Sequence, residues 1–296
     1  MEHGSNQSLG GPLADLAERV RQRASGFSEG QKAVADYVLR DYERAAFLTA
    51  ARLGQRVGVS ESTVVRFAMA LGYAGYPEMQ QILQDMVRNK LTTVDRLLGS
   101  VDGLAEHESV LAKVMQQDID NIRHTLQETV PEAFEEAVGL ILDARRIYVT
   151  GLRSASSLAM FFSFCLNWAL GNVHTLISGV EDWLEQMGQL GENDLLIAIS
   201  FPRYTRKTVE IVEHARGRGA RILAITDSVM SPLARHATVV LPARSSIDSY
   251  VDSFTAPLSL INALLTAVAQ RQKERTVASL DRLESVWRKY RVFWEE

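Results

Sequence analysis

Apolar residues recur at intervals of three and four along the first third of the chain, a spacing typical of amphipathic helices. From residue 131 onward the pattern changes, and short apolar runs rich in β-branched residues alternate with helical segments. This change predicts two structural regions, an all-α N-terminal domain and an α/β C-terminal domain.

Five apolar runs of the second region have the length and composition of strands buried on both faces. They cover residues 145–150, 172–177, 194–200, 221–226 and 238–243. Because helical segments separate them, they predict a doubly wound, five-stranded parallel sheet. Sheets of this kind bind ligands beyond the carboxyl ends of their strands, where the strand order switches.

The patterns divide the chain into five parts. These are a disordered tail (1–14), a helical domain (15–90), a helical linker (91–130), an α/β domain (131–270) and a C-terminal amphipathic helix (271–296). The linker contains a helix whose apolar spacing suits pairing with a second chain. The last helix carries an aromatic stripe, which suits packing on a core or on a partner subunit.

Residues 49–76 carry the most specific local pattern, two short helices joined by a tight turn. Gly58 stands where the first helix must end, a position that favours positive φ. Ser60 follows as an N-cap for the second helix. This is the layout of a helix-turn-helix, which places its second helix in a DNA major groove. An ordinary αα-hairpin remains an alternative for this segment.

The second helix, over residues 60–71, leaves polar side chains at its start and on its outer face. Side chains at such positions contact base edges and phosphates when a recognition helix docks. The candidate DNA-binding residues are Ser60, Glu61, Ser62, Thr63 and Arg66. A twofold dimer would recognise a palindrome in double-stranded DNA with half-sites about one helical turn apart.

Composition limits the classes of protein to consider. The chain has 296 residues, of which 46% are hydrophobic and 23% charged, as in globular proteins. No apolar run is long enough to span a membrane, and the N-terminus lacks the pattern of a signal peptide. The single cysteine, Cys165, lies in an apolar helix over 158–170, which favours a buried structural thiol and a cytoplasmic protein.

The net charge of −4 does not by itself favour nucleic acid as a partner. Residues 1–100 carry 12 Lys and Arg against 11 Asp and Glu, so the helical domain is not a basic block. DNA binding must therefore depend on local arginine placement and on dimerisation.

Hydroxyl side chains follow three of the predicted strands. A turn and a helix start rich in such residues offer backbone N–H groups and side-chain donors to an anion. The candidate ligand-binding residues are Ser154 and Ser156 after the first strand, Ser200, Arg203, Thr205 and Thr208 after the third, and Ser245 after the fifth. Helix capping is the alternative role for each of these loops.

The chain resembles the RpiR family of transcriptional regulators over roughly residues 15–270. The matching segments are VSESTVVRFAMALGYAGYPEMQ in the helical domain, and VTGLRSASSLA, DLLIAIS and ILAITDSVMSPLARHATVVLPA in the α/β domain. The resemblance implies a helix-turn-helix domain joined to a sugar isomerase (SIS) domain. It also implies a cytoplasmic regulator of carbohydrate-metabolism genes whose DNA binding is modulated by a phosphosugar or related anionic metabolite.

The resemblance also assigns residues of the SIS pocket. Ser154 matches the serine after the first strand that contacts the phosphate, and Ser200 and Thr205 match the ends of a Ser-x-Ser-Gly-x-Thr loop. Pro202 replaces the second serine of that loop and removes a hydroxyl and an N–H donor. Arg203 replaces the glycine, and its guanidinium, or that of Arg206, is the candidate substitute contact with the anion.

Two other functions remain open at this point. A sugar-phosphate isomerase, or a former enzyme of that class, would need a general base, for which His174, Glu181, Asp248 and Asp252 are candidates. A protein-interaction module in place of the DNA-binding domain is the other. The six histidines have no metal-ligand spacing, and no dinucleotide or P-loop fingerprint occurs, so we expect no metal and no cofactor. We also expect a non-enzyme. The linker helix and the aromatic C-terminal helix indicate self-association, and we expect a homodimer or homotetramer.

Overall fold

The computed structural model describes residues 12–102, 109–177 and 183–294. The chain divides into two compact units, Met1–Arg96 and Leu97–Glu296, and each unit has its own hydrophobic core. Residues 1–11 of the predicted disordered tail lie outside the described residues. Helix α1 (Pro12–Arg23) includes the last three residues of that predicted tail, so the helical domain begins earlier than the composition suggests.

The first unit is all-α, as the pattern predicts. It contains α1, α2 (Glu29–Arg40), α3 (Tyr42–Ala45), α4 (Ala50–Val57), α5 (Glu61–Ala70) and α6 (Tyr76–Lys90). Ser28 caps α2 in a reciprocal capping box with Gln31, which fixes the start of that helix. Phe27 and Phe67 meet edge to face in the core, with ring centroids 5.5 Å apart.

Polar side chains of α6 hold the segment between α3 and α4. The Tyr76 hydroxyl donates to the carbonyl oxygens of Leu48 (2.7 Å) and Ala45 (3.3 Å). The side-chain amide of Gln80 donates to the carbonyl of Leu48 at 2.9 Å. Burial raises the pKa of Tyr76 to about 12. These bonds satisfy backbone carbonyls that would otherwise be buried without partners.

The second unit contains a parallel sheet of five strands in the order β2-β1-β3-β4-β5. The strands are β1 (Ile147–Thr150), β2 (Val173–Leu176), β3 (Leu195–Ile199), β4 (Arg221–Thr226) and β5 (Val239–Pro242). All five lie within the predicted runs, and β3 is buried at every position. The order reverses between β1 and β3, which makes that pair the switch point of the sheet.

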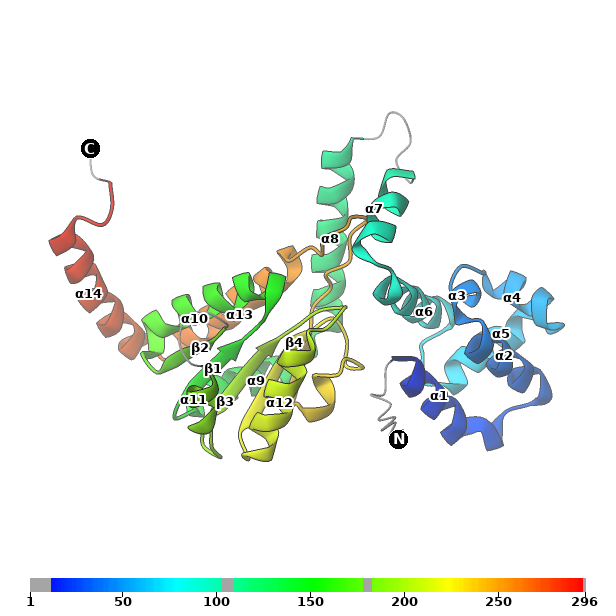
Figure 1. The fold of residues 1–296 in the computed structure, drawn as a ribbon, viewed down its shortest axis with the longest axis horizontal. Helices are drawn as coiled ribbons and strands as arrows, with labels where there is room; N and C mark the ends of the chain where they lie inside the picture. The colour runs from blue at the N-terminus through cyan, green and yellow to red at the C-terminus, as the bar shows by residue number, and fades with distance from the viewer. Residues whose placement is uncertain (1–11, 103–108, 178–182, 295–296) are drawn as a thin grey trace, which may run out of the picture. The chain divides into compact units, whose positions relative to one another are not determined.

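Helices cover both faces of the sheet, so the second unit has three layers (Figure 1). One face packs against α9 (Pro131–Asp143), α10 (Ser156–Leu170) and α13 (Thr255–Arg271). The other packs against α11 (Trp183–Gly188) and α12 (Arg206–Gly217). The doubly wound sheet predicted from the alternating pattern is therefore confirmed.

The predicted linker becomes two helices, α7 (Thr93–Asp102) and α8 (Val110–Glu128). Helix α8 packs against α13 and belongs to the sheet unit. Its buried polar residues bond the loop that follows β5. Asn121 donates to the carbonyl of Ser246 (2.8 Å), and Thr125 accepts from the N–H of Arg244 (2.9 Å).

Further contacts extend this polar seam between α8 and residues 244–255. Glu128 pairs with the guanidinium of Arg244, and Asp118 accepts from the hydroxyls of Ser253 and Thr255. Near the start of α8, Lys113 lies 3.5 Å from Asp248. Gln117 also accepts from the N–H of Asp248. With this contact, six side chains of one face of α8 hold the loop at the carboxyl end of β5.

The apolar helix α10 is more exposed than the sequence pattern indicates. Helix α10 packs its inner side against the sheet, but Met160, Phe161 and Phe164 are 38–63% exposed. Helix α14 (Lys273–Tyr290) packs along α10 through Trp168 and Trp287, whose rings lie 5.5 Å apart. The apolar composition of residues 158–170 predicts a buried helix, and this prediction is wrong for the outer side of α10, because only one side of the helix faces the sheet.

Candidate functional sites

The turn between α4 and α5 has the geometry of a helix-turn-helix. Gly58 ends α4 with φ of 76°, in the left-handed region that glycine favours, as its position predicts. The N–H of Val59 donates to the carbonyl of Gly54 at 2.9 Å. A Cβ on Gly54 would lie 2.7 Å from the carbonyl oxygen of Val59, so this close approach requires glycine. Sequence reasoning identified Gly58 but not Gly54, whose signal is a glycine inside a helical run.

Ser60 caps α5 by accepting from the N–H of Thr63 at 3.3 Å. Its hydroxyl also lies 2.9 Å from the hydroxyls of Ser62 and Thr63. Of the five candidate DNA-binding residues, four are exposed at the start and outer side of α5, namely Ser60, Glu61, Ser62 and Arg66. Thr63 is half-buried, and a Cβ on Gly30 would lie 3.1 Å from its methyl carbon, so this residue faces α2 as well as solvent.

Two further exposed cations lie on the preceding helix, α4, and were not among the sequence candidates. Arg52 and Arg56 are exposed on α4, and both line a groove with Phe47 and Gln55. In helix-turn-helix complexes the first helix crosses the phosphate backbone, so exposed arginines on α4 are candidates to contact DNA phosphates. The signal in the sequence is the spacing of four residues between them, which places both on one side of a helix.

At the switch point of the sheet, the loops after β1 and β3 lie close together. A Cβ on Gly151 would lie 2.7 Å from the carbonyl oxygen of Ala155 and 3.2 Å from that of Ile199. The first residue after β1 is therefore restricted to glycine by the end of the neighbouring strand. This close approach brings the candidate residues after β1 and those after β3 to the same edge of the sheet.

Both loops contain an arginine with positive φ. Arg153 has φ of 57° and Arg203 has φ of 63°, values that L-residues with a Cβ adopt at a cost. Arg203 stands where the related loop has glycine, and it keeps the left-handed backbone of that position. Substitution of the glycine therefore adds a guanidinium without abolishing the turn, while Pro202 still lacks the N–H donor of the residue it replaces.

The hydroxyls after β1 bond their own turn. The Ser156 hydroxyl donates to the carbonyl of Arg153 at 2.6 Å, within the start of the 3-10 turn Arg153–Ala155 that precedes α10. The Ser157 hydroxyl donates to the carbonyl of Ser154 at 2.8 Å. Local capping therefore accounts for part of this hydroxyl cluster, whereas Ser154 is exposed at the tip of the turn.

The candidates after β3 differ in their surroundings. Ser200 is buried at the strand end, and its N–H donates to the carbonyl of Ile225 at 3.2 Å. Thr205 is the N-cap residue of α12 but makes no side-chain capping bond. Thr208 is fully buried, and its hydroxyl has no hydrogen-bond partner in the described structure. Arg206 and Lys207 both pair with Glu210, at 3.1 and 3.5 Å.

A side-chain bond ties the loop after β3 to the end of β4. The Tyr204 hydroxyl donates to Asp227 at 2.7 Å, and the Thr226 hydroxyl lies 3.1 Å from the same carboxylate oxygen. The sequence pattern indicates no role for Tyr204 or Asp227. Tyr204 and Asp227 hold the edge of the candidate pocket together.

The remaining candidates lie away from the switch point. Ser245 follows β5, an edge strand that β4 separates from β3, and its carbonyl accepts from the N–H of Ser253. Among the candidate bases, His174 stacks on Tyr148 on the edge strand β2, with ring centroids 5.2 Å apart, and Asp248 pairs with Lys113. Asp252 shares the loop of Asp248, and Glu181 lies outside the described residues.

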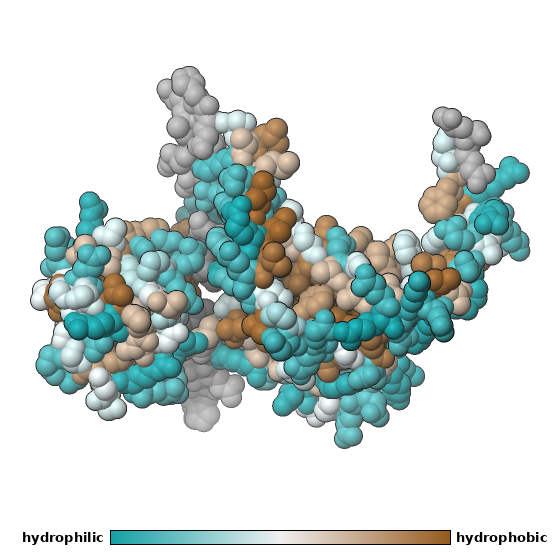
Figure 2. All heavy atoms as spheres, turned by 180° about the vertical axis from the view of Figure 1, so that it is seen from behind, coloured by the Kyte–Doolittle hydropathy of each residue, from teal (hydrophilic) through white to brown (hydrophobic). Residues whose placement is uncertain are grey.

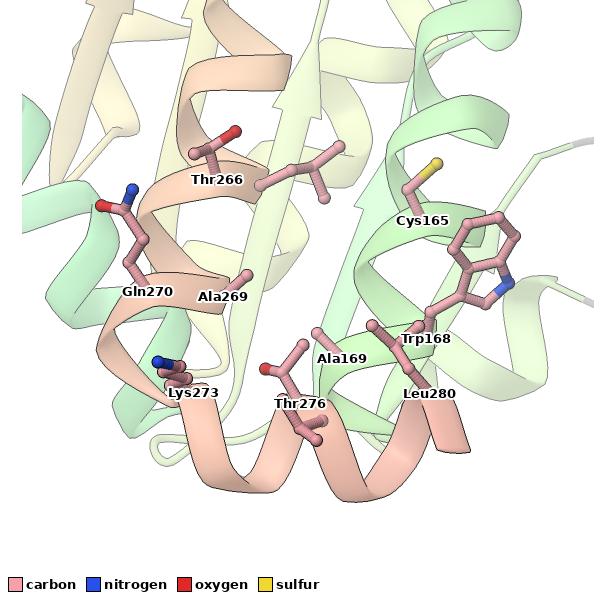
Figure 3. A pocket seen from close by; sticks show the side chains of 11 residues that line it. Cys165, Trp168, Ala169, Thr266, Ala269, Gln270, Lys273, Thr276 and Leu280 are labelled. Atoms are coloured by element: carbon pink, nitrogen blue, oxygen red, sulfur yellow. The ribbon is translucent and has the colours of Figure 1, made fainter. Parts of the chain in front are cut away.

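Cys165 lies in a different place, a groove of about 640 Å³ between α10, α13 and α14 (Figure 3). Apolar side chains form most of its walls, with Lys273, Gln270 and Thr276 along α13 and α14. Burial raises the pKa of the Cys165 thiol, which disfavours the thiolate needed for nucleophilic attack. Cys165 is half-buried and not fully buried as the apolar pattern predicts, and its raised pKa favours a structural role for the thiol.

The described residues contain no group of three or more His, Cys, Asp or Glu side chains that could hold a metal ion. Within the same residues, no helix is both long and apolar enough to cross a membrane.

Comparison with known proteins agrees with this geometry. Residues 14–90 match the family model of the rpiR-family helix-turn-helix domain. Residues 140–267 match the family model of the SIS domain. It is 28% identical to the HTH-type transcriptional regulator HexR of Pseudomonas aeruginosa, over 88% of this chain and 91% of that protein. Identity to HexR of Escherichia coli is 26%, over 94% and 96% of the two chains.

Two solved structures share the fold. The sugar isomerase domain of an RpiR transcription factor from Sphaerobacter thermophilus is 32% identical and matches with a TM-score of 0.58, over 60% of this chain and 99% of that domain. The Vibrio vulnificus NanR protein complexed with ManNAc-6P matches with a TM-score of 0.57 at 20% identity, over 93% and 98% of the two chains. The second likeness shows the arrangement of helices and sheet only.

Proposed function

The chain belongs to the RpiR family of transcriptional regulators, and we propose that it controls carbohydrate-metabolism genes by binding DNA in response to a phosphorylated sugar or a related anionic metabolite. The observation that carries the proposal is the exposed polar start of α5 behind the glycine turn of α4. A helix presented in this way fits the major groove.

In the proposed complex, α5 enters the major groove of double-stranded DNA. Ser60, Glu61, Ser62 and Arg66 contact bases or phosphates, and half-buried Thr63 contributes mainly by holding the N-cap. Arg52 and Arg56 of α4 contact the phosphate backbone. A homodimer, or a homotetramer built from dimers, presents two such helices to a palindromic operator.

The proposed effector pocket lies at the switch point between β1 and β3. The uncapped start of α12, with Thr205, offers N–H donors to a phosphate, and Ser154 and Ser200 supply hydroxyls. Arg203 supplies a charge-assisted contact. Ser156 stabilises the turn after β1 through its bond to the carbonyl of Arg153, and Thr208 is buried in the first turn of α12. Ser245 lies in the loop after β5 and affects the pocket only through the position of that loop. The phosphorylated sugar named with the related NanR structure supports this class of effector.

We further propose that the sheet unit binds its effector without converting it chemically. A general base must lie within hydrogen-bond reach of the proton that it removes. The described candidate bases instead lie on the outer strand β2 or in the loop bonded to α8. The similarity to the HexR regulators of Pseudomonas aeruginosa and Escherichia coli supports the same assignment.

Fluorescence anisotropy of a labelled fragment from upstream of the protein's own gene tests the proposal. We expect saturable binding that resists excess nonspecific DNA. Aldohexose 6-phosphates and N-acetylhexosamine 6-phosphates, each paired with the unphosphorylated sugar, then serve as effector candidates. A shift in DNA affinity with a phosphorylated compound only would support the pocket. Turnover of any of these compounds by the full chain would contradict the non-enzymatic role, and a protein that binds no DNA fragment from the genome would contradict the regulator.

The variant Ser200→Ala addresses the pocket separately. Loss of this hydroxyl should weaken the response to the active sugar phosphate about tenfold, the worth of one charge-assisted hydrogen bond. DNA affinity without effector should not change, because Ser200 is buried in the sheet unit. An unchanged dose response would remove Ser200 from the pocket.

A further inference from the structure

Helix α8 presents a continuous row of apolar side chains to solvent. Figure 2 shows the row as a column of brown side chains along the helix. Its members are Leu111 (72% exposed), Met115 (58%), Ile119 (48%), Ile122 (38%) and Leu126 (77%), and Val130 (55%) follows just beyond the helix end. A row of this length on an otherwise polar helix marks a protein interface.

The row is not the inward face of α8. That face carries Asn121 and Thr125, both buried, and it is bonded to residues 244–255 by the polar seam. The sheet unit has therefore already covered one side of the helix with its own loop. The apolar row lies on a second side, which is left for another molecule.

The spacing of the row identifies that molecule. The intervals are four, four, three, four and four residues, so the row is symmetric about the midpoint between Ile119 and Ile122. An antiparallel pair of identical helices crossing at this midpoint would bring apolar residues opposite one another at every level. The pairs are Ile119 with Ile122, Met115 with Leu126, and Leu111 with Val130.

We infer that α8 is the dimerisation surface of this protein and that its occupant is α8 of a second copy in antiparallel orientation. The inference deepens the proposed function, because a regulator of palindromic DNA needs a twofold axis. The exposed parts of the six side chains amount to roughly 600 Å² in one copy, so a pair buries about 1,200 Å², the lower end of the range for specific interfaces.

The charges beside the midpoint are complementary. Asp120 and Arg123 flank the apolar row and pair with each other within the helix. The twofold arrangement places Arg123 of each copy on the same side of the crossing as Asp120 of the other, so charges of both signs are mixed beside the apolar row.

The outer side of α10 is a competing apolar surface among the described residues, with Met160, Phe161 and Phe164 exposed. It is already partly covered within the chain, because Phe164, Trp168 and Trp287 form a series of ring contacts that includes α14. Its apolar residues also lack the symmetric spacing of the row on α8. A variant in each surface can separate the two.

Sedimentation equilibrium of the full chain, without DNA or effector, tests the inference. We expect a dimer for the wild type and for Phe164→Glu. Ile119→Glu should raise the dimer dissociation constant about 100-fold, because it buries an unpaired carboxylate at the centre of the interface. An equally tight dimer in Ile119→Glu, with dissociation in Phe164→Glu, would overturn it. Far-UV circular dichroism checks that each variant is folded, and the assay is independent of DNA binding.

Engineered cysteines test the orientation in a Cys165→Ser background. Met115→Cys mixed with Leu126→Cys should form a disulfide between the two chains under mild oxidation, since antiparallel pairing makes these positions neighbours. Met115→Cys alone should cross-link poorly. Efficient cross-linking of Met115→Cys to itself would indicate parallel helices and contradict the proposed arrangement.

Discussion

Positive backbone φ angles fall on different residues in the two units. In the described part of the helix-turn-helix unit they occur at Gly58 and Gly72, where no side chain is needed. In the sheet unit, the loops at the switch point place Arg153 and Arg203 at φ of 57° and 63°. A left-handed L-residue costs roughly 1–2 kcal/mol, and such conformations concentrate at binding sites. The sheet unit also has positive φ at Gly171, Gly219 and Arg291, but the two switch-point loops place arginine at such positions beside the candidate pocket.

The two candidate sites also differ in how they present their chemistry. On α5, exposed side chains stand on a regular helix whose start is fixed by Ser60. At the sheet edge, loop backbone, a helix start and buried hydroxyls contribute together. Changes of side chain should therefore have a direct effect in the first site. In the second site, a side-chain substitution should also change ligand binding indirectly, by altering the shape of the loops.

The largest effect is expected for Arg66→Ala on α5. Loss of one guanidinium from each half of a dimer should raise the dissociation constant for operator DNA about 100-fold. Arg21→Ala is the matched control, since Arg21 is an exposed cation of the same unit that pairs only locally with Glu18. Anisotropy at one fixed salt concentration compares the two. Equal losses would mean that net charge, and not the position on α5, determines affinity.

Tyr76→Phe probes the support behind α4 without touching the DNA surface. The variant loses two hydrogen bonds to backbone carbonyls, at a cost of about 2 kcal/mol at pH 8. In the wild type, the pKa of Tyr76 is raised to about 12 by burial. The unfolded chain, with an ordinary tyrosine pKa near 10, thus releases this proton first as pH rises.

The sign of the pH dependence follows from that order. The contribution of Tyr76 is fully present below pH 10 and is lost between pH 10 and about 12. Urea unfolding at pH 8 and pH 11 should therefore show a smaller gap between wild type and variant at pH 11. A gap that stays constant would mean that Tyr76 ionises equally in the folded and unfolded states.

Much of this architecture could be predicted from the sequence, because the local signals agree with the fold. The five strands follow from apolar runs between helical segments, although burial on both faces is found for β1, β3 and β4 and not for the edge strands β2 and β5. The turn of the helix-turn-helix follows from Gly58 and Ser60. These features depend on residues that are neighbours in the chain.

The rest depends on contacts between distant residues. Nothing local in the sequence indicates that Asn121 bonds the loop at Ser246, or that Tyr204 bonds Asp227. Likewise, the sequence shows arginine in place of glycine at position 203 but not that the left-handed turn persists there. Such features arise from tertiary packing, which overrides local preference.

The polar seam of α8 should affect coupling more than either binding reaction alone. Asp118→Ala removes the acceptor for Ser253 and Thr255. We expect the change in DNA affinity caused by the active sugar phosphate to fall about fivefold, with each separate affinity nearly unchanged. Asp118→Asn keeps an acceptor and should restore most of the coupling. Gln127→Ala, on an exposed part of the same helix, is the control, and equal loss there would contradict a role for the seam.

The smallest effects come from exchanging the two kinds of turn residue. Gly58→Arg places a side chain at φ of 76° and should cost about 1 kcal/mol of stability. Arg203→Gly relieves a similar cost but makes the unfolded chain more flexible, so its stability should stay within about 0.5 kcal/mol of the wild type. Urea unfolding of both variants measures this asymmetry.

Arg203→Ala completes the argument, because it keeps the left-handed strain and removes the guanidinium. If the guanidinium contacts the effector, Arg203→Gly and Arg203→Ala should weaken effector binding equally, by about tenfold. If only the turn geometry matters, the glycine variant should bind as well as the wild type while the alanine variant stays close to it. Titration calorimetry with the active sugar phosphate separates these outcomes, and full binding by both variants would show that the Arg203 guanidinium makes no contact with the effector.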